Sequence, residues 1–219
     1  MHTYTAGMID TPILYSFRRC PYAMRARMAI AYAGINVGLR EVVLKDKPPA
    51  MLEVSPKGTV PVVIDVDGRI IEESRDVMRW ALDQNDPDAW LAGLGLDDPL
   101  ISACDDDFKH WLDRYKYAVR FPEQDEIWYR GQAEAFLGTL ETRLEKAQFL
   151  TGSALSVTDI AIFPFIRQFA NVDLKWWESH PYPNTARWLD SLVSSELFVR
   201  VMKKYPQWRD GDPEIPFPA

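Results

Sequence analysis

The first part of the chain alternates short apolar runs with segments of helical periodicity. Residues 22–33 place Met24, Met28 and Ala31 on one stripe behind Pro21, which predicts a helix. Asp67-Gly68, between two β-rich runs, is typical of a hairpin turn, and Ser74 is the expected N-cap of a following helix. Strands are predicted at residues 13–17, 39–44, 62–66 and 69–71. The pattern predicts an α/β domain over residues 11–83.

Helical spacing dominates the rest of the chain. Residues 84–98 are rich in Asp, Pro and Gly and predict a linker, and residues 99–209 predict an all-helical domain. Ser156 and Asp159 form a close variant of the capping box, ahead of a helix that is apolar on most faces and therefore buried. A last helix is expected over residues 184–204, followed by an irregular, proline-rich tail after Trp208.

Composition and charge narrow the class of protein. The 219 residues are 47% hydrophobic and 26% charged, as in a folded soluble protein, and the net charge of −7 argues against nucleic-acid or anionic-membrane partners. We expect no membrane span and no secretory signal. Two cysteines, Cys20 and Cys104, form no disulfide framework and favour a cytoplasmic protein. The three histidines lie far apart in sequence, so no metal site is expected.

Five segments in order carry a resemblance to a known family: Ser16-Phe17-Arg18-Arg19-Cys20-Pro21-Tyr22-Ala23, Leu44-Lys45-Asp46-Lys47-Pro48, Thr59-Val60-Pro61-Val62, Glu73-Ser74, and residues 152–165. Together they resemble the glutathione transferase family, and in particular its cysteine-type, omega-like members with a glutaredoxin-like Cys-Pro-Tyr-Ala turn. The resemblance covers about residues 13–208. It implies a thioredoxin-like N-terminal domain, an all-α C-terminal bundle, glutathione as co-substrate and a homodimer.

Cys20 is the candidate reactive residue. It lies between a strand and the start of a helix, beside Arg18 and Arg19, and these positive charges favour the thiolate. Ala23 stands where a dithiol protein would carry its second cysteine, which leaves a monothiol cycle through a Cys20–glutathione mixed disulfide. Cys104 lies on an apolar helix stripe and is interpreted as a packing residue. We interpret Arg25 and Arg27 as a solvated helix face.

The resemblance also implies a glutathione site and a second-substrate pocket. The γ-glutamyl end of glutathione would be held by Glu73 and Ser74, the backbone of glutathione by Val60 beside a cis Pro61, and its glycyl carboxylate by Lys47. Glutathione-binding residues are expected to be Phe17, Lys47, Thr59, Val60, Pro61, Glu73 and Ser74, and pocket residues Tyr22, Trp111 and Tyr115.

Three functions remain open at the sequence level. The first is a glutathione-dependent thiol transferase or reductase of small disulfides, dehydroascorbate or glutathionylated substrates. The second is conjugation of glutathione to electrophiles, with Ser16 or Tyr15 as the activating hydroxyl, whereas dehalogenation or quinone reduction would again use Cys20. The third is a non-catalytic binding or regulatory protein on the same fold. The resemblance extends to intracellular channel proteins, but no candidate membrane helix supports that role.

Overall fold

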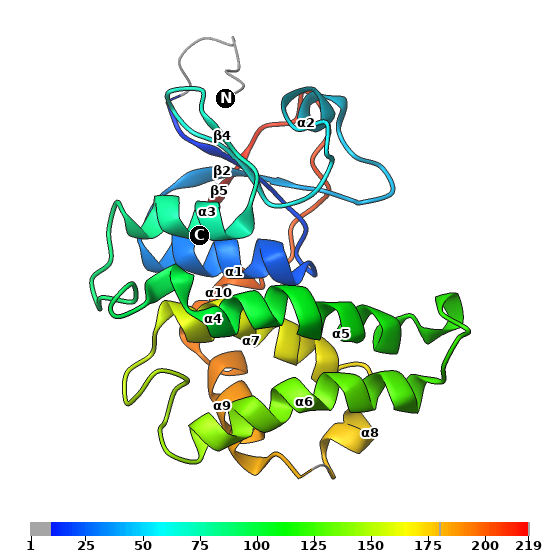
Figure 1. Cartoon of the computed structure of the whole chain (residues 1–219). Coiled ribbons are helices and arrows are strands. Elements are labelled where there is room, and N and C mark those ends of the chain that lie inside the picture. The colour runs from blue at the N-terminus through cyan, green and yellow to red at the C-terminus, as the bar shows by residue number, and fades with distance from the viewer. Residues whose placement is uncertain (1–9, 180, 219) are drawn as a thin grey trace. The chain divides into compact units, whose positions relative to one another are not determined.

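The computed structural model describes residues 10–179 and 181–218, which form two compact units (Figure 1). The first unit consists of residues 10–88 together with residues 195–218, and the second of the described residues between 89 and 194. The predicted fold class is confirmed, because the first unit combines a sheet with helices and the second is helical. Among the described residues, no helix is both long and apolar enough to span a membrane.

A mixed five-stranded sheet, in the order β4-β3-β1-β2-β5, forms the centre of the first unit. Strands β1 and β2 are parallel, so they need a crossover, which α1 provides. The other neighbouring strands are antiparallel. Residues 10–88 of this unit contain β1 (Ile13–Ser16), α1 (Pro21–Tyr32), β2 (Val37–Glu41), α2 (Pro49–Val54), β3 (Val62–Ile64), β4 (Ile70–Ile71) and α3 (Ser74–Leu82).

Helices cover both faces of this sheet. Helices α1 and α3 pack together on one face, and α2 lies on the other (Figure 1). Successive strand residues point to opposite faces, and Tyr15 and Val62 therefore share the face that packs against Met51 of α2 and against Trp208. This arrangement makes the strands buried on both sides and explains their nearly continuous apolar sequence.

The predicted hairpin between β3 and β4 is confirmed. Gly68 has φ +80°, and the backbone N–H of Asp65 donates to the carbonyl of Arg69 at 2.9 Å. Helix α2 was not predicted from the sequence. Pro49 is its first helical residue, a position where the missing N–H of proline costs nothing.

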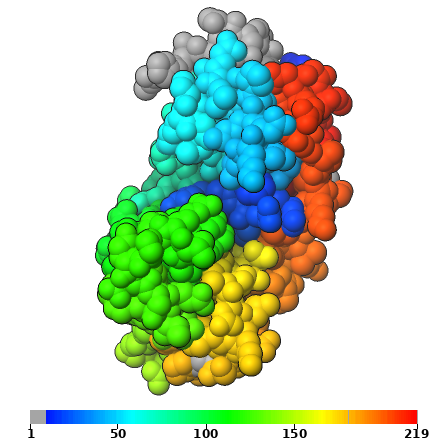
Figure 2. All heavy atoms as spheres, turned by 90° about the vertical axis from the view of Figure 1, so that its right-hand side faces the viewer, coloured from blue at the N-terminus to red at the C-terminus, as the bar shows by residue number. Residues whose placement is uncertain are grey.

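Residues 195–218, which begin with α10 (Glu196–Val201), belong to the first unit, contrary to the prediction that the helical domain extends to residue 209. The tail of the first unit follows α10. It runs along the edge of the first unit, coloured red in Figure 2. The Trp208 N–H donates to the Glu41 carbonyl at 2.8 Å, and β5 (Ile215–Phe217) pairs with β2. The tail is therefore an ordered part of the sheet and not the irregular extension that its prolines suggested.

Arg40 fixes this tail. Its guanidinium lies 4.1 Å from the Trp208 ring centre and donates hydrogen bonds to Tyr15 and Glu214. These bonds from Arg40 are the main cause that lowers the pKa of Glu214.

Replacing Arg40 with methionine is expected to reduce stability by about 1 kcal/mol, since the pair is partly exposed and screened by solvent. A carboxylate with a lowered folded pKa stabilises the fold above its unfolded pKa, and this stabilisation is lost as the pH falls through the folded value. The difference in the free energy of unfolding between wild type and Arg40→Met, measured with urea, should therefore become smaller in acid. An equal difference at all pH values would contradict this account.

The second unit is a helical bundle around α7 (Val157–Ala170), which is buried along most of its length, as predicted. Asp159 closes the predicted capping box and is itself fully buried. The other helices of the unit are η1 (Gly95–Asp97), α4 (Pro99–Ala103), η2 (Cys104–Phe108), α5 (Lys109–Lys116), η3 (Ala118–Arg120), α6 (Glu126–Leu144), α8 (Leu174–Trp177) and α9 (Pro183–Val193).

Two boundaries differ from the sequence-based expectation. The predicted linker, residues 84–98, divides at residue 88, and its second half packs into the helical unit. Trp90 is buried, and Asp98 caps α4 while accepting a hydrogen bond from Thr158 at 3.1 Å. The predicted last helix breaks into α9 and α10 because the Ser195 side chain caps a new helix start.

Candidate active site

Cys20 occupies the N-cap position of α1, directly after the turn that leaves β1. Its N–H donates to the Phe17 carbonyl at 3.0 Å, and its own carbonyl accepts from Met24 at 2.9 Å. The cysteine is free and only partly buried. The N-terminus of a 12-residue helix presents unpaired N–H groups and partial positive charge, so a thiolate formed here is stabilised.

The turn before β3 faces this cysteine. The Cys20 thiol donates to the Val60 carbonyl at 3.7 Å, which joins two segments that are 40 residues apart. The Val60–Pro61 peptide is cis, as the resemblance implied, and Thr59 is exposed beside it. A Cβ added at Gly58 would lie 3.3 Å from Lys47 Nζ, so the ammonium of Lys47 sits at the start of the same turn. The structure therefore brings five of the predicted residues to one place: Cys20, Lys47, Thr59, Val60 and Pro61.

Ser74 and Glu73 lie at the start of α3, with roles that differ from simple capping. Glu73, not Ser74, is the N-cap residue, and Ser74 is the first residue of the helix. The buried Ser74 hydroxyl accepts hydrogen bonds from Arg25 Nε at 3.1 Å and from Nη2 at 2.9 Å. Arg25 therefore fixes the Ser74 side chain from α1, and the helix N–H groups remain as anion donors.

Lys57 is a neighbour of the site that the sequence analysis missed. Its ammonium forms an ion pair with the Glu73 carboxylate, and this hydrogen bond is the main cause that raises the pKa of Lys57. Both side chains are exposed, so the pair is weak and Glu73 can exchange it for another ammonium. Lys57 and Glu73 are 16 residues apart and share no helix, so no periodic pattern in the sequence predicted this contact.

Arg25 and Arg27 are buried, which corrects the prediction of a solvated helix face. Each is 1% exposed. The Arg25 guanidinium also lies 5.1 Å from the centre of the Tyr22 ring, in the first turn of α1. Charged residues are retained in a core only with good partners, so these arginines serve the site or its support.

The predicted pocket residues of the second unit have different environments. Tyr115 is buried and packs on Phe169, with ring centres 5.2 Å apart, so it belongs to the core of the bundle. Trp111 is partly buried in an aromatic group with Trp128, at 5.7 Å, and Tyr129. Cys104 is buried, as expected for a packing residue.

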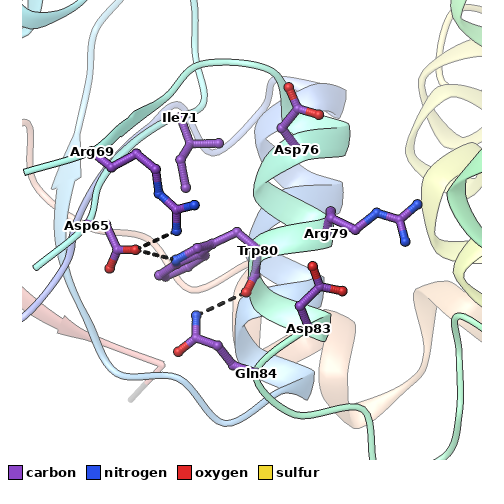
Figure 3. A pocket seen from close by; sticks show the side chains of 8 residues that line it. All are labelled: Asp65, Arg69, Ile71, Asp76, Arg79, Trp80, Asp83 and Gln84. Carbon is purple, nitrogen blue, oxygen red and sulfur yellow. Dashed lines mark hydrogen bonds and ion pairs between the residues drawn. The ribbon is translucent and has the colours of Figure 1, made fainter. Parts of the chain in front are cut away.

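A separate pocket of about 520 Å³ lies between the β3–β4 hairpin and α3 (Figure 3). Its Asp65 accepts hydrogen bonds from Arg69 and from the Trp80 indole, at 2.9 and 2.8 Å. None of the predicted site residues lines it. In the part of the chain that the structure describes, no group of three or more potential metal ligands is found.

Comparisons with known proteins agree with this architecture. The family model "Glutathione S-transferase, N-terminal domain" matches residues 14–90, and "Glutathione S-transferase, C-terminal domain" matches residues 88–191. Glutathione S-transferase omega-1 of Rattus norvegicus is 26% identical over 197 residues, covering 85% of this chain and 80% of that protein. Elongation factor 1-gamma of Prunus avium is also 26% identical, over 227 residues, covering 93% of this chain and 50% of that protein.

Among solved structures, the glutathione transferase URE2P6 from Phanerochaete chrysosporium, in complex with oxidized glutathione, aligns with a TM-score of 0.75. The identity is 20%, over 87% of this chain and 94% of that one. Fold and site thus define a thioredoxin-like domain, with a cysteine at the first helix, followed by a helical domain. The two family matches together span most of the chain, and the chain belongs to the glutathione S-transferase family.

Proposed function

We propose that the protein is a glutathione-dependent thiol transferase in which Cys20 carries the glutathionyl group. The observation that supports this most is the position of the Cys20 thiol. It is partly exposed at the start of α1, 3.7 Å from the Val60 carbonyl, with Ala23 in place of a second cysteine. Such a thiol can form a mixed disulfide but cannot close a local disulfide.

Glutathione would lie across the residues gathered around Cys20. The start of α3 offers N–H groups to the γ-glutamyl carboxylate, and Glu73 can release Lys57 to pair with the γ-glutamyl ammonium. The peptide would run along Val60, and Lys47 would hold the glycyl carboxylate. Glutathione as the ligand is supported by the URE2P6 structure, which is in complex with oxidized glutathione, and by a glutathione transferase family member from Pseudomonas fluorescens with two glutathione bound.

The reaction proceeds in two thiol–disulfide exchanges. The Cys20 thiolate attacks the glutathione sulfur of a mixed disulfide, the S–S bond breaks, and the substrate leaves as a thiolate that takes up a proton. A second glutathione thiolate then attacks the glutathionyl sulfur on Cys20. Glutathione disulfide leaves and the Cys20 thiolate is restored. The net reaction converts one mixed disulfide and one glutathione into a free thiol and glutathione disulfide.

The environments of Tyr15 and Ser16 favour Cys20 over a hydroxyl-dependent conjugation mechanism. Both residues are 0% exposed. The Ser16 hydroxyl accepts a hydrogen bond from Arg27 at 2.8 Å, and the Tyr15 hydroxyl accepts one from Arg40. A buried hydroxyl held by a guanidinium has no path to a ligand sulfur at the surface of the turn.

Mass spectrometry of trapped intermediates tests the proposal. Reduced protein treated with the mixed disulfide of glutathione and cysteine should gain one glutathionyl group on the Cys20 peptide, and added glutathione should remove it. Cys104, which is buried, should remain unmodified and serves as the internal control. Glutathione binding without any adduct on Cys20 would contradict the mechanism and favour a binding role. Turnover of electrophiles, without reduction of mixed disulfides, would favour conjugation.

The family resemblance also implies a homodimer with oxidoreductase activity toward small disulfides, and the two cysteines without a disulfide framework favour a cytoplasmic location. The physiological second substrate would be a glutathionylated small molecule or protein. These assignments stay predictions.

A further inference from the structure

A pair of buried charges lies beside the Cys20 turn. Arg27, from α1, is 1% exposed, and Glu41, at the end of β2, is 7% exposed. The Arg18 N–H donates to Glu41 Oε1 at 2.6 Å, and the Arg18 carbonyl accepts from Arg27 Nη2 at 2.7 Å. The two side chains thus hold both backbone polar groups of a residue located two positions before Cys20.

This cluster also contains most of the unpaired polar atoms. Among the described residues, four buried side-chain N or O atoms have no hydrogen-bond partner, and they include Arg27 Nε, Glu41 Oε2 and Tyr205 Oη. Arg27 also contacts Met202, so the tail contributes to the enclosure. Unpaired buried polar atoms are costly and uncommon, and three of them in one cluster indicate a role other than stability.

Electrostatic coupling connects the cluster to the cysteine. Burial lowers the pKa of Arg27 to about 10, although the charges of Glu41 and Cys20 raise it, so Arg27 remains cationic at neutral pH. Burial raises the pKa of Glu41, although the hydrogen bond from the Arg18 N–H and the charges of Arg27 and Arg18 lower it. Burial likewise raises the pKa of Tyr205, which faces both charges. The charge of Cys20 also acts on Arg27, which connects the cluster to the thiol.

We propose that Arg27 and Glu41 are positioning residues that hold the Cys20 turn and set the pH range in which its thiol reacts. The positive charge of Arg27 favours the thiolate, and the negative charge of Glu41 partly offsets it. The inference rests on the proposed function only in that Cys20 is taken as the reacting thiol.

The test is the pH dependence of Cys20 alkylation by iodoacetamide, measured on the Cys20 peptide by mass spectrometry. This readout needs no turnover, so it remains interpretable even if the protein is no thiol transferase. In Glu41→Gln, the uncompensated Arg27 should move the midpoint down by about 0.3 pH units or more. In the double variant Arg27→Gln, Glu41→Gln, loss of the Arg27 charge that acts on Cys20 should move the midpoint up by about 0.5 to 1 pH units relative to wild type.

Glu214→Gln is the matched control. It also removes one carboxylate next to β2, but Glu214 pairs with Arg40 and not with Arg27. Its midpoint should equal that of wild type. If the substitutions only loosened the turn, the alkylation midpoints of both cluster variants would move in the same direction. That result would overturn the proposal, and so would an unchanged midpoint in the double variant. If Glu41→Gln does not fold, the double variant, which leaves no buried charge unpaired, still decides the question by its comparison with wild type.

Discussion

Replacing Cys20 with serine is expected to lower the rate of mixed-disulfide reduction on the order of a thousandfold or more, while the fold is retained. A serine hydroxyl is close in size but does not form a mixed disulfide, and thiol–disulfide exchange depends on a thiolate. Cys20 is partly exposed at the N-cap, although it also packs against the core, and serine is a residue of similar size that is favourable at an N-cap. The loss of activity should therefore appear without a loss of stability.

The measurement compares initial rates of wild type, Cys20→Ser and Cys104→Ser with the same mixed disulfide, together with glutathione binding by calorimetry. Cys104 is buried in the helical unit, so Cys104→Ser should keep the activity of its folded fraction. Glutathione should still bind to Cys20→Ser, since Val60, Glu73 and Ser74 are unchanged. Substantial mixed-disulfide reduction by Cys20→Ser would show that another group performs the chemistry.

Replacing Asp159 with alanine is expected to destabilise the protein by about 3 to 5 kcal/mol. This fully buried carboxylate accepts hydrogen bonds from the Leu150 N–H at 2.9 Å, the Ser156 N–H at 3.1 Å, the Ser156 hydroxyl at 2.7 Å and the Trp188 indole at 2.9 Å. It thus joins the loop before α7, α7 itself and α9. Alanine would leave several of these buried donors without an acceptor, which costs more than the loss of the bonds themselves.

Urea unfolding of Asp159→Ala beside Asp173→Ala provides a matched comparison. Asp173 also caps a helix, and its side chain accepts from the Trp176 N–H at 3.0 Å, but it is not buried. Loss of that cap should cost about 1 kcal/mol. Asp159→Asn should be intermediate, because an amide keeps one acceptor oxygen and replaces the other with a donor. Equal losses for the two alanine variants would show that Asp159 acts only as a helix cap.

Features that depend on neighbouring residues could be predicted from the sequence. The β3–β4 turn follows from Asp67-Gly68, since a glycine there accepts the positive φ that the turn needs. The start of α1 follows from Pro21, and the start of α7 follows from Ser156 and Asp159. The position of Cys20 at a helix start was predicted in the same way, from the order of a strand, a turn and an amphipathic helix.

Features that depend on distant partners could not be predicted. Arg25 and Arg27 are charged residues on a predicted helix, and such residues are mostly exposed to solvent. They are buried because Ser74, Ser16 and the Arg18 carbonyl, from other segments, provide acceptors. Similarly, Ile215-Pro216-Phe217 resembles a loop, and only its register with β2 makes it a strand.

The return of the tail to β2 has a consequence for synthesis on the ribosome. Residues 10–88 are translated first, but strand β5 and Trp208, which complete their sheet, are translated only after the whole helical unit. During this interval one edge of β2 has no neighbouring strand, and the face that Trp208 covers is open. The nascent first unit therefore passes through a stage with an unprotected sheet edge, at which chaperones or a second nascent chain can bind.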